Sequence, residues 1–472
     1  MTTLRRSSPA PVLAPAPIDP YLAVDTAAGL VSREIFVDEG VFQQELDNLF
    51  ARVWLFVGHE SQIPEPGDYF VSRMGTDSVI MSRGVDGEVH VLLNSCRHRG
   101  MKVCRYDMGN TLQFTCPYHG WSYSVDGSLV STPGELFGVP HFKATYGGKL
   151  DRAKWGLVPV PHMRNYKGLI FASWDPEAVP FDQYVGEFRH WLDSLTDSLA
   201  GVEGGTMVFD GVLKWRVNAN WKFIGENFLG DMYHAETSHA SVEAAGIGPA
   251  GAGASRHGND PATLAKRRTT QHATSFTLLG HGSVDTVYEE RVPPVFADHP
   301  ELTEYFAGLS RLKHARRLEG GRPLGAHGPA TLFPSMSFHA SGFPRTILVA
   351  HPVSATQTEM WRWFIVDKDA PDNVRDWLRH YYLRYSGPAG LTEQDDMENW
   401  SYATEASRGV IARRYSYNYS QGLGMTSPAS LEGAVESTSW STEENARNFY
   451  RRWARFVAGE TWPQLMADEA AE

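Results

Sequence analysis

The sequence has few cysteines and no long apolar run, and each shortage excludes a class of protein. Only three cysteines occur in 472 residues, so a disulfide framework is excluded and a reducing, cytoplasmic setting is expected. No apolar stretch reaches the roughly 18 residues that a membrane-spanning helix needs. The N-terminus, MTTLRRSSPAPVLAPAPIDP, lacks the continuous apolar segment of a signal peptide, and we expect residues 1–18 to form a flexible leader.

Positive charge is also in short supply. Lysine and arginine number 43 against 55 aspartates and glutamates, giving a net charge of −12, which argues against general binding of nucleic acid. What is present is 42% hydrophobic and 12% aromatic residues, the composition of a folded chain with a substantial core. At this length one ordinary core is too small, so two domains are expected.

The pattern along the chain predicts a β domain set within a larger domain. Residues 38–54 have helical spacing of apolar residues, and residues 54–174 hold short β-rich runs between turns, typical of a small antiparallel β domain. We therefore predict an α+β chain in which this β domain interrupts a larger α+β domain. The predicted parts are the N-terminal part of the larger domain at 19–53, the β domain at 54–174 and the rest of the larger domain at 175–472.

Within the larger domain, four stretches carry distinct patterns. Residues 213–240 favour helix, 243–330 are Gly-rich and irregular, and β-like runs return at 330–366. Two helices are predicted near 393–411 and 441–458. Gly459 stands where it would end the last one.

The stretch SCRHRGMKVCRYDMGNTLQFTCPYHGWSY, residues 95–123, carries two pairs of metal-ligating residues. One residue separates Cys96 from His98, two separate Cys116 from His119, and seventeen lie between the pairs. Glycine or proline beside each pair provides a tight bend. The pattern therefore predicts two ligand-bearing loops.

Three interpretations of these loops compete: unrelated residues in a β domain, a Cys2His2 zinc site, and a Rieske-type [2Fe–2S] cluster. Zinc sites more often pair cysteine with cysteine and histidine with histidine along the sequence. In the cluster, one iron takes two thiolates and the other takes two imidazoles, so alternating Cys and His give each loop one ligand for each iron. The pattern favours the cluster. Cys104 is left over and is interpreted as a small buried residue.

A second constellation lies in NWKFIGENFLGDMYHAETSH and GLTEQDDMENW. The first segment holds His234 and His239, but five residues advance about 500° around a helix, so one ligand must come from a helix end or bend. The second places Asp395 and Asp396 in the first turn of a predicted helix, where the helix dipole alone could account for them. Two histidines and a carboxylate form the facial triad of non-haem Fe(II) oxygenases.

The segments CRHRG and CPYHGWSY closely resemble the Rieske centre of the aromatic ring-hydroxylating dioxygenases, and GDMYH and EQDDMENW are similar to the catalytic domain of the same family. The resemblance covers nearly the whole chain and points to the large (alpha) subunit of the terminal oxygenase. It implies a Rieske domain inserted into a catalytic domain whose central antiparallel sheet is flanked by helices, a helix-grip or START-like fold. It also implies two cofactors, a [2Fe–2S] cluster and a mononuclear Fe(II).

The resemblance assigns the metal ligands residue by residue. They are Cys96, His98, Cys116 and His119 for the cluster, and His234, His239 and Asp396 for the mononuclear iron. Trp121 matches an aromatic residue that packs at the cluster.

Asp231 resembles the carboxylate that bridges an iron-bound histidine and a cluster histidine of the neighbouring subunit. Glu226 and Asn227 lie in the same matching stretch and are further catalytic candidates. A surface or helix-capping role for Glu226 stays open.

The activity that the resemblance implies is cis-dihydroxylation of an aromatic compound with O2. Electrons would come from NAD(P)H through a reductase, a ferredoxin or both. They would pass between adjacent subunits of a homotrimer, or of an α3β3 hexamer with a small beta subunit. The alternatives are a Rieske monooxygenase or O-demethylase, and a Rieske-type electron carrier without catalysis. The length and the second motif oppose the carrier, and GDMYH and EQDDMENW fit the dihydroxylating branch better.

The chain departs from hydrocarbon-oxidising relatives just before the carboxylate ligand. Where they tend to carry aromatic residues, RYSGPAGLTEQDD holds Ser386 and Thr392. This more polar wall favours a larger cavity or an aromatic carboxylate such as phthalate, although a polycyclic or biaryl hydrocarbon stays possible. A carboxylate would need an arginine fork, for which the candidates are Arg345, Arg267 and Arg268, each of which could equally be a surface residue. The predicted pocket consists of Asn227, Phe228, Met232, Ser386 and Thr392.

Two surface features are candidates for further roles. A basic cluster on the first loop could dock an acidic electron donor or be an ordinary solvated face; it consists of Arg97, Arg99, Lys102 and Arg105. The Gly-rich run at 244–255 could be a mobile loop over the pocket entrance or a plain linker.

Overall fold

The computed structural model describes residues 18–131, 137–248, 271–276, 279–286, 292, 294–320, 326–339, 344–437 and 441–467. The predicted leader, apart from Ile18, lies outside the described residues. Among the helices that are described, none combines the length and the apolar character that crossing a bilayer requires.

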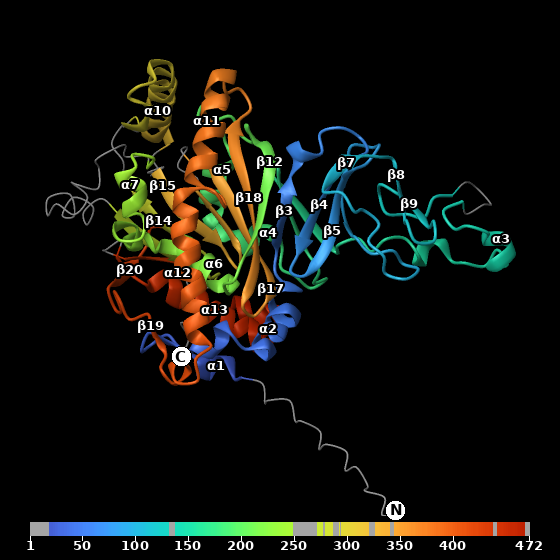
Figure 1. Cartoon of the computed structure of the whole chain (residues 1–472), viewed down its shortest axis with the longest axis horizontal. Helices are drawn as coiled ribbons and strands as arrows, with labels where there is room; N and C mark the ends of the chain where they lie inside the picture. Colours follow the sequence, from blue (N-terminus) through green and yellow to red (C-terminus); the bar gives the residue numbers. More distant parts are fainter. Residues whose placement is uncertain are drawn as a thin grey trace, which may run out of the picture.

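The first part of the chain after the N-terminal helices is built from short antiparallel strands. They form a four-stranded sheet in the order β6-β5-β4-β7, a β8-β9 hairpin, and a three-stranded sheet in the order β10-β11-β3. Figure 1 shows the β4–β9 region projecting to one side of the molecule. The strands are β3 (Leu55–His59), β4 (Asp68–Met74), β5 (Asp77–Arg83), β6 (Val89–Leu93), β7 (Met108–Asn110), β8 (Gln113–Thr115), β9 (Ser122–Ser124), β10 (His162–Tyr166) and β11 (Leu169–Ser173).

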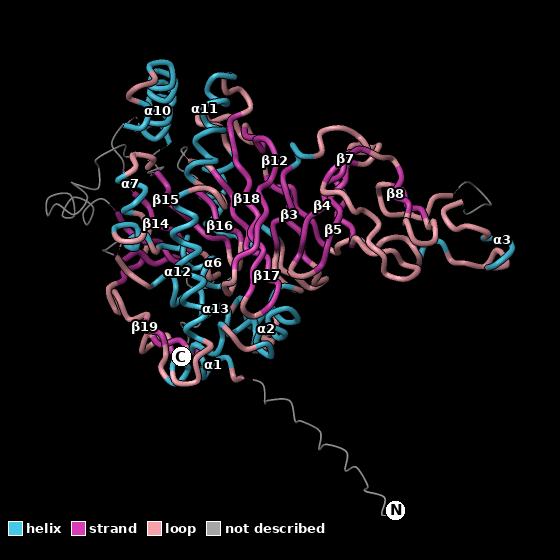
Figure 2. The backbone as a smooth tube through the Cα atoms, viewed as in Figure 1, coloured by secondary structure: helices cyan, strands magenta, loops and turns pink. Residues whose placement is uncertain are grey.

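The rest of the chain is organised around a large antiparallel sheet. Nine strands of the described residues pair in the order β12-β18-β17-β16-β15-β14-β13-β21-β20, drawn in magenta in Figure 2. The predicted α+β fold class, with an antiparallel sheet in the larger domain, is confirmed. The strands are β12 (Thr206–Val217), β13 (Gln271–Phe276), β14 (Gly282–Thr286), β15 (Ala326–Leu332), β16 (Met336–His339), β17 (Thr346–Ser354), β18 (Gln357–Asp367), β20 (Thr426–Pro428) and β21 (Ala434–Ser437).

Helices cover this sheet and carry the candidate site. Helix α6 packs against β14, β15, β16 and β17, and α13 packs against both α6 and β13. The main helices are α2 (Glu39–Glu45), α5 (Arg189–Thr196), α6 (Trp221–Gly230), α7 (Ala240–Ala244), α10 (Pro300–Gly320), α11 (Asp372–Tyr385), α12 (Leu391–Ser407) and α13 (Glu444–Val457).

An ion pair buried in the core joins three of these helices. Lys222 of α6 lies 2.5 Å from Glu45 of α2, and both side chains are fully buried. The Nε1 atoms of Trp221 and Trp453, the latter on α13, each donate to the Glu45 carboxylate at 2.8 Å. The N-terminal segment is therefore part of the larger domain's core, and it holds the start of α6 in place.

Polar contacts tie the small β domain to the large sheet. Glu359 of β18 lies 3.3 Å from Arg73 of β4 and 3.1 Å from Arg216 of β12. Lys214 of β12 reaches Asp107, just before β7, at 2.9 Å. Glu359 and Lys214 lie on the adjacent strands β18 and β12 at the edge of the large sheet. Their contacts with Arg73 and Asp107 therefore fix the orientation of the β domain on that edge.

Two stretches were predicted wrongly. Residues 213–217 continue strand β12 rather than forming helix, and α6 begins only at Trp221. The 243–330 stretch, predicted to be irregular, contributes β13, β14, α10 and the start of β15. The pairing partners of β13 include β21, far along the sequence, so local composition could not reveal it.

Helix boundaries differ modestly from those predicted. The helical pattern of 38–54 divides into α2 and a π-helical turn over Leu46–Phe50. The helices predicted at 393–411 and 441–458 extend over Leu391–Ser407 and Glu444–Val457. Gly459 has φ +81° and ends the last of these, as predicted.

Candidate metal centres

The two loops that bear the cysteine–histidine pairs have the same backbone geometry. In the first, Gly100 N donates to Cys96 O and Cys96 N donates to Met101 O, both at 2.8 Å. In the second, Gly120 N donates to Cys116 O at 3.0 Å, and Cys116 N donates to the Trp121 carbonyl at 2.7 Å. Both glycines have φ +74°, a left-handed conformation that residues with a side chain rarely adopt.

The four side chains on these loops suit the two ends of a [2Fe–2S] cluster. Cys96 and Cys116 are buried free thiols, and the His98 and His119 rings lie together with centroids 4.5 Å apart. Burial, His119 and Arg99 lower the pKa of His98, which favours the neutral imidazole that binds metal. The buried Nδ1 of His98 has no hydrogen-bond partner among the described residues, as a ligand atom would.

A single-metal zinc site fits these donors less well. In the described part of the chain, the one set of three or more donors that converges within 4.8 Å lies elsewhere. The donor atoms of Cys96, His98, Cys116 and His119 do not converge on one point in this way, which suits a cluster with two irons better than a single metal ion. Trp121 stacks on His98 at 5.2 Å with an interplanar angle of 6°, in agreement with its predicted packing at the cluster.

Tyr123 and Cys104 complete the surroundings of the cluster loops. The Tyr123 hydroxyl lies 3.2 Å from Cys96 Sγ and accepts from Arg97 N at 3.1 Å. Cys104 is buried, as predicted, and burial raises the pKa of its thiol to about 12.

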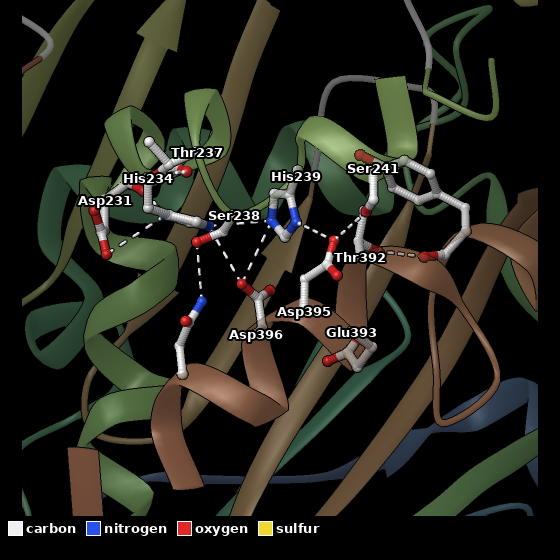
Figure 3. Close-up of polar contacts among 12 residues, drawn as sticks. Asp231, His234, Thr237, Ser238, His239, Ser241, Thr392, Glu393, Asp395 and Asp396 are labelled. Atoms are coloured by element: carbon white, nitrogen blue, oxygen red, sulfur yellow. Dashed lines mark hydrogen bonds and ion pairs between the residues drawn. The ribbon is translucent and has the colours of Figure 1, made fainter. Parts of the chain in front are cut away.

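The second set of donors converges at the end of α6 and on α12 (Figure 3). Helix α6 is capped by Asn220 and ends at Gly230; a 3-10 turn over Met232–Glu236 then carries His234, and His239 follows in the next turn. This break supplies the bend that the five-residue spacing requires. Asp396 projects from the first turns of α12, between the two rings in Figure 3.

The geometry of this triad fits one metal ion. Single ligand atoms of His234, His239 and Asp396 all lie within 4.8 Å of one another. Asp396 Oδ1 is 3.3 Å from His234 Nε2 and 3.4 Å from His239 Nε2, yet this buried oxygen makes no properly aligned hydrogen bond within the described residues. His234 Nε2 and His239 Nε2 are themselves 3.1 Å apart, so the three donor atoms gather around one point.

Two further carboxylates orient the histidines from behind. His234 Nδ1 is hydrogen-bonded to the Asp231 backbone carbonyl and lies 3.4 Å from Asp231 Oδ2. Asp395 Oδ2 lies 3.4 Å from His239 Nδ1 while accepting from Ser241 Oγ at 2.9 Å. Carboxylates in this position fix the tautomer and the ring orientation of a ligating histidine. In the sequence the helix dipole alone could account for Asp395, and no local pattern indicated this contact, which only the fold brings about.

The site is strongly anionic without a metal. Burial lowers the pKa of His234, but the close contacts and negative charges of Asp231 and Asp396 outweigh it and raise the pKa to about 10. A divalent cation held by the triad would balance the negative charge of the same carboxylates. The second Asp231 oxygen, Oδ1, is buried without a partner among the described residues.

Glu226 is neither a surface residue nor a helix cap. It is half-buried on α6 and accepts hydrogen bonds from the hydroxyls of Tyr419, at 2.9 Å, and Tyr450. Burial, with the charges of Asp231 and Glu443, raises its pKa to about 8 against the opposing effect of the two tyrosines.

The predicted pocket residues are only partly assembled around the triad. Phe228 is buried on α6, and the half-buried Asn227 beside it has no side-chain hydrogen bond within the described residues. Thr392 lies one helical turn before Asp396, and its hydroxyl donates to the Tyr385 carbonyl. Ser386 is buried at the end of α11. The Met232 side chain lies outside what the structure describes.

The predicted arginine fork is not found at Arg345. Its guanidinium is buried, pairs with Asp367 at 2.7 Å and donates to the Ser194 and Asp197 carbonyls, so that candidate was wrong. Arg267 and Arg268 lie outside the described residues, as does most of the 244–255 loop.

The basic cluster divides into two kinds of residue. Arg99, Lys102 and Arg105 are exposed. Arg97 is half-buried: it donates to the Gly156 carbonyl at 3.3 Å and lies over the Trp155 ring at 5.5 Å. Of the four, only the three exposed residues are free to meet a partner.

Comparison with known families agrees with both centres. Residues 53–142 match the Rieske [2Fe-2S] domain, and residues 197–459 match the ring hydroxylating alpha subunit (catalytic domain). The chain belongs to the Rieske non-haem iron aromatic ring-hydroxylating dioxygenases. As a member of this family it uses a [2Fe–2S] cluster and a mononuclear iron, and the donors described above fit both.

Relatives of this dioxygenase alpha subunit align over nearly its whole length. It is 37% identical to the biphenyl 2,3-dioxygenase alpha subunit of Rhodococcus jostii (strain RHA1), covering 95% of this chain and 93% of that one. It is 36% identical to the benzene 1,2-dioxygenase alpha subunit of Pseudomonas putida, covering 94% of each. A phenanthrene-bound mutant of naphthalene 1,2-dioxygenase superposes with a TM-score of 0.80 at 30% identity, covering 95% and 96% of the two chains.

Proposed function

We propose that this alpha subunit cis-dihydroxylates an uncharged aromatic ring, using O2 and two electrons. The observation that carries the proposal is the convergence of His234, His239 and Asp396 in a chain that also bears the four cluster donors. Two histidines and one carboxylate leave coordination positions open on the iron, which suits activation of O2. When bound, the iron supplies the oxygen chemistry and the cluster supplies stored electrons.

The protein's own residues orient and connect these centres. The Asp231 backbone carbonyl and the Asp395 carboxylate accept the Nδ1 protons of His234 and His239, so that each Nε2 faces the iron site. Asp231 keeps one buried oxygen without a partner in the described chain, and we propose that it accepts a hydrogen bond from a cluster histidine of a neighbouring subunit. This contact would require a homotrimer or an α3β3 hexamer with a beta subunit.

Electrons are proposed to come from NAD(P)H through a reductase, a ferredoxin or both. The exposed Arg99, Lys102 and Arg105 lie on the first cluster loop and the segment after it, where they would attract an acidic donor on a chain of net charge −12. We place the enzyme in the cytoplasm, where its three cysteines stay reduced.

An uncharged substrate is favoured over an aromatic carboxylate such as phthalate. Two buried arginines of the larger domain, Arg345 and Arg362, are both neutralised by carboxylates, Asp367 and Glu393. Neither is free to balance a second negative charge, and burying an unpaired carboxylate is costly. The names of the relatives, which act on biphenyl and benzene, agree with this choice.

The test is product analysis under ¹⁸O2. Cells making this chain with its electron donors are given biphenyl, phenanthrene and phthalate separately. The proposal predicts a cis-diol from an uncharged arene, with both oxygen atoms labelled. A product carrying one labelled oxygen would indicate a monooxygenase or O-demethylase, and conversion of phthalate alone would contradict the substrate class.

A further inference from the structure

His339 is the one accessible residue of a strand at the centre of the large sheet. The other three residues of β16 are buried, whereas His339 is only half-buried. Its ring meets the ring of Phe228, on α6, edge-on with centroids 5.2 Å apart. His339 is the last residue of β16, so its accessible surface lies at the end of the strand, beside Phe228 of α6.

The alternation of the strands places several polar residues on this same face. Ser337 and His339 are two apart, so they point to one side of the sheet. Ser337 Oγ lies 2.9 Å from Thr331 Oγ1, which donates to the Gly225 carbonyl of α6 at 2.9 Å. The face that carries His339 is thus the face covered by the helix that leads to His234.

A chain of hydrogen bonds runs from the iron-binding helix to the imidazole. Arg362 of β18 pairs with Glu393, three residues before Asp396 on α12, at 2.7 Å from Glu393 Oε1. Arg362 Nη1 donates to Thr346 Oγ1 at 2.9 Å. Thr346 stands opposite His339 in the β16–β17 register, and its Oγ1 lies 3.4 Å from His339 Nδ1.

This chain fixes where the protons lie. A guanidinium can only donate hydrogen bonds, so the Thr346 hydroxyl accepts one from Arg362. The same hydroxyl can then donate its hydrogen bond to His339 Nδ1. Burial, together with Arg362 and His239, lowers the pKa of His339 to about 3, and the ring is therefore neutral. The hydrogen of the imidazole then resides on Nε2, for which the described residues supply no partner.

We propose that His339 is a specificity residue, which donates a hydrogen bond from Nε2 to an oxygen on the aromatic substrate and so orients the ring beside the triad. The proposal rests on the proposed function and narrows its substrate class to uncharged arenes that carry an oxygen acceptor, such as an aryl ketone. Arg362 is neutralised by Glu393, so the subsite has a donor but no net positive charge. Thr346 is the positioning residue.

The test compares two ligands of the same shape. Benzophenone and diphenylmethane differ by a carbonyl in place of a methylene, and their dissociation constants are measured on the holoenzyme by equilibrium titration. Wild type should bind benzophenone about tenfold more tightly, the ratio expected for one hydrogen bond. His339→Leu, which keeps an apolar side chain but has no N–H, should bring the ratio to about one.

Thr346 supplies a second pair of variants. Thr346→Val should reduce the preference for benzophenone, because Nδ1 loses its donor, and Thr346→Ser should restore it. A ratio unchanged in both His339→Leu and Thr346→Val would overturn the subsite. Turnover of biphenyl is followed separately: absence of any diol contradicts the proposed function, whereas the binding ratios decide the subsite by themselves.

Discussion

At the scale of single residues, the mononuclear iron site depends on side chains that contact its histidine ligands and not the metal itself. Asp231 is the clearest case, with one oxygen 3.4 Å from His234 Nδ1 and the other buried without a partner in the described chain. Its amide analogue would have nearly the same shape but no charge. Replacing Asp231 therefore tests electron delivery without removing a metal ligand.

We expect Asp231→Asn to retain both metal centres and to lose turnover by about 100-fold or more, because the bridge between subunits needs the carboxylate. Iron content and the electron paramagnetic resonance signal of the reduced cluster check the first part, and product formation checks the second. Glu398→Gln, an exposed acid on α12, is the matched control. Activity that survives in Asp231→Asn would contradict the proposed electron path.

The raised pKa of Glu226 predicts how the stability of the protein depends on pH. Burial raises its pKa to about 8 from an ordinary 4.5, so the folded protein holds the proton more tightly than the unfolded chain does. Its contribution to stability is present below about pH 4.5 and is lost as the pH rises through about 8. The slope is at most about 1.4 kcal/mol per pH unit.

Glu226→Gln should therefore remove part of this pH dependence. The variant's urea-unfolding midpoint, relative to wild type, should be higher at pH 8 than at pH 5. A difference between the two proteins that is the same at both pH values would show that Glu226 is ionised in the folded state.

At the scale of elements, the start of α6 is held in place from within the core. Lys222 and Glu45 are fully buried, and two tryptophans donate to the carboxylate. Burial lowers the pKa of Lys222, and Glu45 opposes that effect. Removing one partner of such a pair leaves a buried charge uncompensated.

Glu45→Gln should therefore destabilise the protein by about 3–5 kcal/mol. The double variant Glu45→Gln/Lys222→Met, which leaves no buried charge, should recover much of that loss. Urea unfolding of the three proteins measures both effects. A single variant as stable as wild type would mean that the pair does not secure α2, α6 and α13.

The elements also show what the sequence could and could not predict. The cluster loops are local, since each ligand pair and its glycine lie within five residues, so the motif was sufficient. Strand β13 pairs with β21, about 160 residues further along, and its Gly-rich surroundings gave no signal. Asp395 and Arg362 acquire their roles only because α12 lies against α7 and the sheet, which no local pattern records.

At the scale of the whole molecule, charge is distributed unevenly. The chain carries a net charge of −12, yet Arg99, Lys102 and Arg105 are exposed on and just after a cluster loop. We expect replacing all three by Ala to raise the apparent KM for an acidic electron donor and to flatten its dependence on salt, because steering is electrostatic. Arg97 is left unchanged, since it packs on Trp155.

The control for this surface is Lys368→Ala, an exposed lysine immediately after β18. It should leave the apparent KM for the donor and its salt dependence unaltered. An unchanged KM in the triple variant would make the basic cluster an ordinary solvated face.

The proposed activity requires two separate iron centres in one chain, and the metal content of two proteins decides whether both are present. Iron and acid-labile sulfide are quantified in wild type and in Asp396→Ala, together with the paramagnetic resonance signal of the reduced proteins. We predict two irons and two sulfides at the cluster plus one further iron in wild type. Asp396→Ala should lose the further iron alone and keep the Rieske signal. A colourless, zinc-containing wild type, or an Asp396→Ala protein with unchanged iron content, would contradict the account.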